Sequence, residues 1–315
     1  MQRYTLRFPG ARTVDGHLPG RVLGALLHVL AHGSAGALLL RAEGRSAVRD
    51  DRLPDWVERG TDFVLLNQLE GDAPGVVVGA LPLGDALPER FEQGDMFSPL
   101  DPGQSALSLF AASLDEAASG AIDSDAFDDD LLRVFSNDLS KLFRRERVQQ
   151  LTIQNGRPDA KLRSFDRGIV QTMKSLRDRT PRPRRVRLAG RMDVVRYSRS
   201  LFTLDLADGS HVRGVLVEAR PELLKPHLGE QVVVEGHAQF RPSGRVLRID
   251  VERISPASET DLAVFSIEPR PLSEGIDVRS LRRSQTASTG INAIFGKWPG
   301  DESDEDVDEF LSTMS

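Results

Sequence analysis

The sequence of 315 residues contains no cysteine. Without thiols the chain cannot form a disulfide framework, a zinc site built on thiolates or a catalytic thiol centre. This absence fits a reducing compartment, and we expect a cytoplasmic location. The first ten residues, MQRYTLRFPG, do not combine a charged segment with an apolar one, so they do not resemble a secretory signal.

Long uninterrupted apolar runs are also missing. The most apolar stretch, VLGALLHVLAHGSAGALLL, is broken by His28, His32 and Ser34. Apolar residues in its first half recur at helical spacing, whereas ALLLRAEG resembles a strand. We therefore interpret the stretch as a buried helix followed by a strand, and we expect no association with a membrane.

The common signatures of catalysis are absent as well. The sequence has no Walker A pattern, no G-x-G-x-x-G fingerprint and no G-x-S-x-G elbow. His28 and His32, four residues apart, could share a metal, but no H-E-x-x-H pattern surrounds them, so we interpret them as residues of helix packing. The acidic stretch DSDAFDDD lacks the glycine and the distal glutamate of an EF-hand loop and is interpreted as a solvated helix start. We expect no enzyme, no cofactor and no metal site.

The residues that are present indicate a folded protein. Apolar residues make up 39% and charged residues 28% of the chain, which is typical of a globular protein with a core. We predict an α+β protein with three parts: a mixed α/β domain over residues 1–179, a small OB-like five-stranded β-barrel over residues 180–257, and a linker with a disordered acidic tail over residues 258–315. We assign no role to the first part.

Local patterns place the elements of the first part. RYTLRF, DFVLLNQLEG, GVVVGALPL and VQQLTIQNG are predicted as strands. A helix is predicted to begin after Ser105, which would cap it, and another to follow the acidic stretch. RSFDRGIVQTMKSLRDR is predicted as a further helix that ends before the prolines of TPRPRR.

The second part has a clearer order of elements. RRVRLAGRMDVV, SLFTLDL, HVRGVLV, EQVVVEGHAQF and RVLRIDVERI are predicted as five strands, with a short helix or turn between the third and the fourth. The Asp-Gly pair in ADGS predicts a tight hairpin turn. This order is typical of an OB barrel, although another small barrel of similar length would also fit.

Charge is unevenly distributed along the chain. The net charge is −6, with acidic residues concentrated in DSDAFDDD and in the last segment, while the centre is basic. The overall acidity argues against non-specific DNA binding by the whole protein.

The last segment, GKWPGDESDEDVDEFLSTMS, combines carboxylates with apolar anchors. Val307, Phe310 and Leu311 would share one face of a short helix, and such a segment can fold on a partner. The alternative is a solubilising acidic tail, which does not explain Trp298 or Phe310. The partner-binding anchors that this pattern predicts are Trp298, Phe310 and Leu311.

Two loops of the predicted barrel offer an alternative site. Basic and aromatic residues there could neutralise phosphates and stack on the bases of a single strand. The candidates are Arg196, Tyr197, Arg199, Phe240, Arg241 and Arg245. Arginines also decorate ordinary turns, Phe240 could be a core residue, and OB barrels also bind proteins.

Two stretches resemble known proteins. FRPSGRVLRIDVERI, preceded by FTLDLADGS, is similar to a set of uncharacterised bacterial proteins, and IFGKWPGDESDEDVDEFL resembles the tail of bacterial proteins that pair with PIN-domain ribonucleases in toxin–antitoxin-like operons. The resemblance implies an antitoxin-like protein whose tail docks on a partner nuclease and restrains it. The partner-binding residues that the resemblance implies are Trp298, Pro299, Gly300, Asp301, Glu302, Asp304 and Glu305. Antitoxins are typically shorter and carry a DNA-binding module, whereas this chain has no obvious helix-turn-helix pattern.

Overall fold

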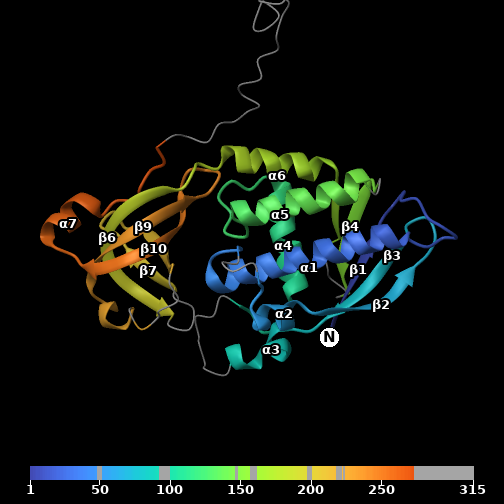
Figure 1. The fold of residues 1–315 in the computed structure, drawn as a ribbon, viewed down its shortest axis with the longest axis horizontal. Coiled ribbons are helices and arrows are strands. Elements are labelled where there is room, and N and C mark those ends of the chain that lie inside the picture. The colour runs from blue at the N-terminus through green and yellow to red at the C-terminus, as the bar shows by residue number, and fades with distance from the viewer. Residues whose placement is uncertain are drawn as a thin grey trace, which may run out of the picture. The chain divides into compact units, whose positions relative to one another are not determined.

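A computed structural model describes residues 1–47, 52–91, 100–145, 148–156, 162–196, 201–217, 222 and 224–272 (Figure 1). It contains one open sheet and one closed barrel, together with several helices. The predicted α+β class is therefore confirmed.

The open sheet has five strands in the order β2-β3-β1-β4-β5, and all its neighbours are antiparallel. Its strands are β1 (Gln2–Arg7), β2 (Phe63–Leu69), β3 (Gly75–Ala80), β4 (Gln150–Asn155) and β5 (Arg163–Asp166). Alternation along β1 buries Tyr4 and Leu6 and leaves Arg3 and Arg7 exposed. One face of the sheet is therefore packed against the helices.

The helices complete this core. They are α1 (Gly20–Glu43), α2 (Asp55–Thr61), α3 (Leu83–Ala86), α4 (Ala106–Ser119), α5 (Asp129–Ser140) and α6 (Gly168–Arg179), with a 3-10 turn at Pro88–Arg90 and a π-helical turn at Lys141–Arg145. Figure 1 shows α1, α4, α5 and α6 gathered beside the sheet. Ser105 caps α4 by accepting a hydrogen bond from the backbone N–H of Ser108, as its sequence predicts.

The stretch around ALLLRAEG corrects the prediction of a helix followed by a strand. It lies inside α1, which runs unbroken for 24 residues. Gly33 and Gly36 let side chains of α4 and α5 approach α1 closely, and this packing stabilises a helix that glycine alone would weaken. The helix is long and apolar enough to cross a membrane, but 61% of its apolar window is buried in the fold, and core helices meet the same criterion.

Two further segments differ from their predictions. Arg163–Asp166 pairs with β4 as strand β5 instead of opening a helix. Glu259–Phe265 forms helix α7 within the stretch predicted to be extended or disordered. Ser258 and Asp261 form a reciprocal capping box at its start, so local hydrogen bonding rather than burial defines this helix.

The barrel comprises β6 (Arg184–Arg196), β7 (Leu201–Asp205), β8 (His211–Leu216), β9 (Gln231–Phe240) and β10 (Val246–Pro256), all of which the sequence predicts. It closes in the order β10-β8-β7-β6-β9 (yellow to orange in Figure 1). The pair β8–β10 is parallel and the other pairs are antiparallel. Phe202, Leu204 and Leu206 point into its core, and Gly209 has the positive φ that the predicted Asp-Gly turn needs.

Candidate functional site: the contact between the barrel and the helices

The residues of the proposed docking segment, Trp298 to Leu311, lie outside the described residues, and so do Tyr197 and Arg199 of the first barrel loop. Arg196 is the last residue of β6. The structure describes the second loop, between β9 and β10. That loop and its surroundings therefore provide the geometry of the site.

The aromatic and basic candidates of the second loop have different environments. Phe240 is only 4% exposed and belongs to the barrel core, as one of the two interpretations of its sequence position predicted. Arg241 donates from Nε to Asp125 Oδ1 at 3.1 Å and also contacts that carboxylate through Nη2. Arg245 is exposed. The ring of Phe240 therefore does not face solvent, and the charge of Arg241 is balanced within the chain.

Strands β7 and β8, the second and third strands of the barrel, pack against the C-terminal end of α1. Gly44 ends α1 in the left-handed conformation, with φ at +72°. A Cβ atom at Gly44 would lie 3.3 Å from side-chain carbons of both Leu201 on β7 and Val215 on β8. Leu201 and Val215 are themselves buried. The chain's own helix therefore covers part of the face formed by β7 and β8.

A buried ion pair joins the two parts next to this contact. Asp128 caps α5 by accepting from the backbone N–H of Leu131 at 3.0 Å, and the backbone N–H and hydroxyl of Ser46 also donate to it. Arg248 of β10 donates to Asp128 Oδ2 at 3.1 Å and to Asp250 Oδ1 at 2.9 Å. The side chains of Asp128 and Arg248 are 5% and 7% exposed. The pair therefore lies in a largely water-excluded contact.

The carboxylates of Asp250 and Asp128 stabilise the positive charge of Arg248. Burial alone would lower the pKa of its guanidinium, but the carboxylates of Asp250 and Asp128 outweigh burial and raise that pKa. The guanidinium thus stays protonated. The carboxylate of Asp128 accepts hydrogen bonds from the backbone N–H of Leu131, from Ser46 and from Arg248 of the barrel. Full satisfaction of this kind makes a buried ion pair tolerable.

The acidic stretch of the sequence therefore has a structural use that its pattern did not predict. The helix start at Asp128 is confirmed, but Asp128 is buried rather than solvated. The backbone N–H of Ser243 donates to the carbonyl of Ile122 at 3.1 Å, which adds a second point of attachment. No local signal could have found these contacts with the barrel, because their partners are separated by 116 to 121 residues.

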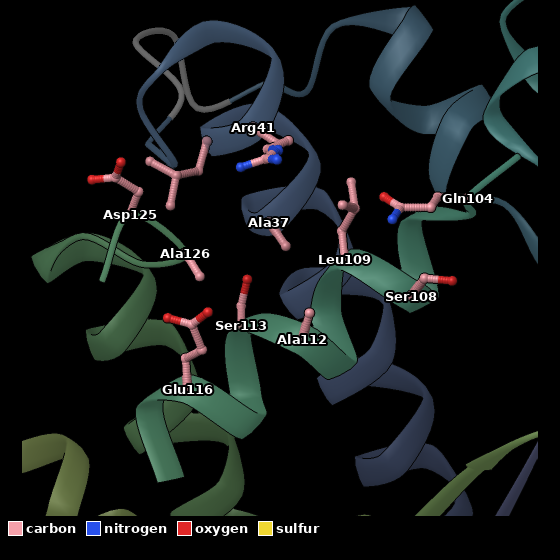
Figure 2. Close-up of a pocket in the computed structure, with 11 residues that line it drawn as sticks. Ala37, Arg41, Gln104, Ser108, Leu109, Ala112, Ser113, Glu116, Asp125 and Ala126 are labelled. Atoms are coloured by element: carbon pink, nitrogen blue, oxygen red, sulfur yellow. The ribbon is translucent and has the colours of Figure 1, made fainter. Parts of the chain in front are cut away.

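A pocket of about 200 Å³ lies beside this contact, between α1, α4 and the acidic stretch. Figure 2 shows the hydroxyl of Ser113 between the side chains of Arg41 and Glu116. Glu116 accepts a hydrogen bond from Ser124. Pockets that bind small molecules usually enclose about 300 to 1,000 Å³, so this one is small for a substrate site.

Among the described residues, one group offers three ligand atoms that could hold a metal ion: His28 and His32 of α1 with Asp138 of α5. The two histidines were interpreted from the sequence as packing residues, and the sequence analysis missed Asp138. The spacing of the histidines was a readable signal, but their carboxylate neighbour comes from a distant helix.

Comparison of the chain with protein-family models, with curated proteins and with solved structures found no match.

Proposed function

We propose that the chain is a non-catalytic interaction protein of antitoxin-like type, in which the α/β part and the barrel form a platform for a docking segment. The observation that carries this proposal is the covering of the β7–β8 face by the end of α1. A barrel whose usual ligand face is partly covered by its own chain is better suited to a scaffold than to strand binding.

The order of the barrel strands supports its assignment to the OB type. In OB folds the second and third strands and the adjoining loops bind oligonucleotides. The corresponding strands here are β7 and β8, since β6 is the first strand of the barrel. Because Leu201 and Val215 are buried on these strands, a nucleic acid strand would have to displace the end of α1 to reach this part of the face.

The loop between β9 and β10 is also poorly suited to binding a single nucleic acid strand. The guanidinium of Arg241 interacts with Asp125, and the Phe240 ring belongs to the core. Stacking needs an exposed aromatic face, and neutralisation of phosphates needs cations that are not already paired. Binding of a single strand at this loop is therefore the weaker of the two functions that the sequence suggested.

The proposed docking segment is the acidic end of the chain. We propose that Trp298, Phe310 and Leu311 fill apolar pockets on a partner nuclease of the PIN-domain kind, while the carboxylates neutralise its basic RNA-binding surface. Aromatic anchors contribute most of the affinity in such contacts, whereas the acidic residues mainly set the association rate and its dependence on salt. The sequence resemblance supports this assignment.

Replacement of Trp298 tests the proposal. We expect Trp298→Ala to weaken binding of the partner by about 2 kcal/mol or more, which is roughly 30-fold in Kd. The partner is first captured from the native host with the full chain and with a chain ending at Gly290, and the affinity of the purified partner is then measured by calorimetry. Met314→Ala is the matched control, since it changes an apolar residue of the same segment outside the proposed contact.

Two results would contradict the proposal. One is an unchanged affinity for Trp298→Ala. The other is tight binding of a single-stranded oligonucleotide that is lost in both Arg241→Ala and Arg245→Ala, since this would move the function to the barrel loop.

A further inference from the structure

His28, His32 and Asp138 form a compact cluster on the surface where α1 and α5 pack together. The two histidines are one helical turn apart, and their ring centroids are separated by 3.8 Å. We propose that these three side chains form a binding site for a divalent transition-metal ion of the zinc class. This inference rests on the described residues alone and is independent of the proposed function.

The distances between the ligand atoms fit such an ion. His28 Nε2 lies 3.6 Å from Asp138 Oδ1, and His32 Nδ1 lies 3.3 Å from Asp138 Oδ2. All three ligand atoms lie within 4.8 Å of one another. Two ligands that each bind zinc at about 2.1 Å with tetrahedral geometry lie about 3.4 Å apart. Small side-chain rotations would therefore bring the three donors around one ion.

The environment of the cluster favours a cation. Asp138 is 7% exposed, whereas the side chains of His28 and His32 are 45% and 52% exposed. A buried carboxylate attracts a positive charge more strongly than a solvated one, because the surrounding dielectric constant is lower. The exposed imidazoles leave the outer side of the site accessible to water, which would fill the remaining coordination positions.

A lysine already pairs with the buried carboxylate of Asp138. Lys141 Nζ lies 3.0 Å from Asp138 Oδ1, and its side chain is 52% exposed. Lys141 also opens the π-helical turn Lys141–Arg145, a feature that is frequent at functional sites. Because the lysine is exposed, it can move into water when an ion binds, and it then acts as a competitor for the carboxylate.

The donor set selects the class of ion. Two imidazoles and one carboxylate suit zinc and its neighbours in the first transition series. Magnesium and calcium prefer oxygen donors throughout. The site should therefore take up Zn²⁺ and discriminate against Mg²⁺, which makes Mg²⁺ a suitable comparison ion.

Titration of the full chain with Zn²⁺ tests the site. The protein is first treated with a chelator, and Zn²⁺ or Mg²⁺ is then added while heat and the thermal unfolding midpoint are recorded. We expect one Zn²⁺ per chain at this site with a raised midpoint, since a ligand that binds only the folded state stabilises it. We expect Mg²⁺ to have no such effect.

Variants assign the binding to the three side chains. His32→Gln and Asp138→Asn should bind Zn²⁺ roughly tenfold more weakly or worse, and Lys141→Ala should bind it more tightly than the wild type. His237→Gln is the matched control, because His237 is similarly exposed, at 46%, and is paired with Glu252 at 3.3 Å. Circular dichroism verifies that each variant is folded.

Two outcomes would overturn the proposal. The first is the absence of one-to-one Zn²⁺ uptake by both the wild type and Lys141→Ala. The second is an equal affinity for Zn²⁺ in the wild type and in a folded His32→Gln variant, which would place the bound ion elsewhere on the chain.

Discussion

At the scale of single residues, α1 uses glycine in two different ways. A Cβ atom at Gly33 would lie 2.5 Å from ring carbons of Phe110 and 3.1 Å from a ring carbon of Phe135. Both rings are fully buried and pack edge to face at a centroid separation of 5.6 Å, so neither has room to move. Gly24, by contrast, is exposed and would meet nothing within 4 Å. Gly33 is thus required by packing, whereas Gly24 is not.

We therefore expect opposite effects from the same substitution at these two positions. Gly33→Ala should destabilise the protein by about 1 to 3 kcal/mol, because the added methyl overpacks a filled core. Gly24→Ala should stabilise it by roughly 0.5 to 1 kcal/mol, because alanine loses less backbone entropy in a helix. Urea denaturation of the two variants measures both values. Destabilisation of equal size at both sites would show that helix propensity, not contact with the phenylalanines, decides the outcome.

At the scale of elements, α7 is a helix of seven residues with no buried residue. Its start is organised by Ser258 and Asp261, and Arg187 of β6 contacts both ends of it. The guanidinium lies 3.0 Å from Asp261 and over the ring of Phe265, at 5.1 Å from its centroid. A helix this short would not form alone, so capping and this contact maintain it.

The cap makes a prediction about pH. The hydroxyl of Ser258 and then its backbone N–H donate to Asp261, and together with Arg187 they lower the pKa of that carboxyl below its usual range. Because the pKa is lowered in the folded state, the stabilisation is present above the unfolded pKa and is lost as pH falls through the folded one. Ser258→Ala should raise the pKa of Asp261, which carbon NMR of the carboxyl measures.

Ser266→Ala is the control for this prediction, because its hydroxyl donates to the carbonyl of Leu262 in the same helix. We expect Ser266→Ala to leave the titration of Asp261 unchanged. The prediction would be wrong if Ser258→Ala also left it unchanged. The stability lost in Ser258→Ala should also be greatest at neutral pH and smaller in strong acid, where the variant still lacks the hydrogen bond that the Ser258 hydroxyl accepts from the backbone N–H of Asp261.

The elements also show what the sequence could and could not predict. The five barrel strands were predictable because alternation and turn residues are local signals. The second half of α1 was predicted wrongly, since a short apolar run fits a strand as well as a buried helix. Helix α7 was missed although Ser258 and Asp261 have capping-box spacing. The contacts of Asp128 and Asp138 could not be predicted, because their partners come from distant parts of the chain.

At the scale of the whole described chain, the contact around Asp128 joins the barrel to the helices. One compact unit spans Met1–Ile276 and contains both. The side chains of Arg248, Arg241 and Ser243 of the barrel donate to Asp128, Asp125 and Asp123 of the acidic stretch. We therefore expect the two parts to unfold together.

Asp128→Ala tests this coupling. The substitution removes a helix cap and leaves the buried guanidinium of Arg248 with one carboxylate, so we expect a loss of about 3 to 5 kcal/mol. Scanning calorimetry of the wild type should show one transition, and the variant should show two. Asp130→Ala is the control, since the Asp130 side chain is 40% exposed and is paired with Arg133, three residues further along the same helix. Its effect should stay within about 0.5 kcal/mol. Two transitions in the wild type would contradict the coupling.

The ion pair between Asp128 and Arg248 also has a consequence for biosynthesis. The acid is translated 120 residues before its base. At typical rates of about 5 to 20 residues per second, the interval is roughly 6 to 24 seconds. During that interval the nascent helices hold a carboxylate whose cation has not yet been made. Completion of the last barrel strand therefore finishes both parts at once, and the emergence of β10 from the ribosome, rather than synthesis of the first domain, marks the moment at which the N-terminal part reaches its final stability.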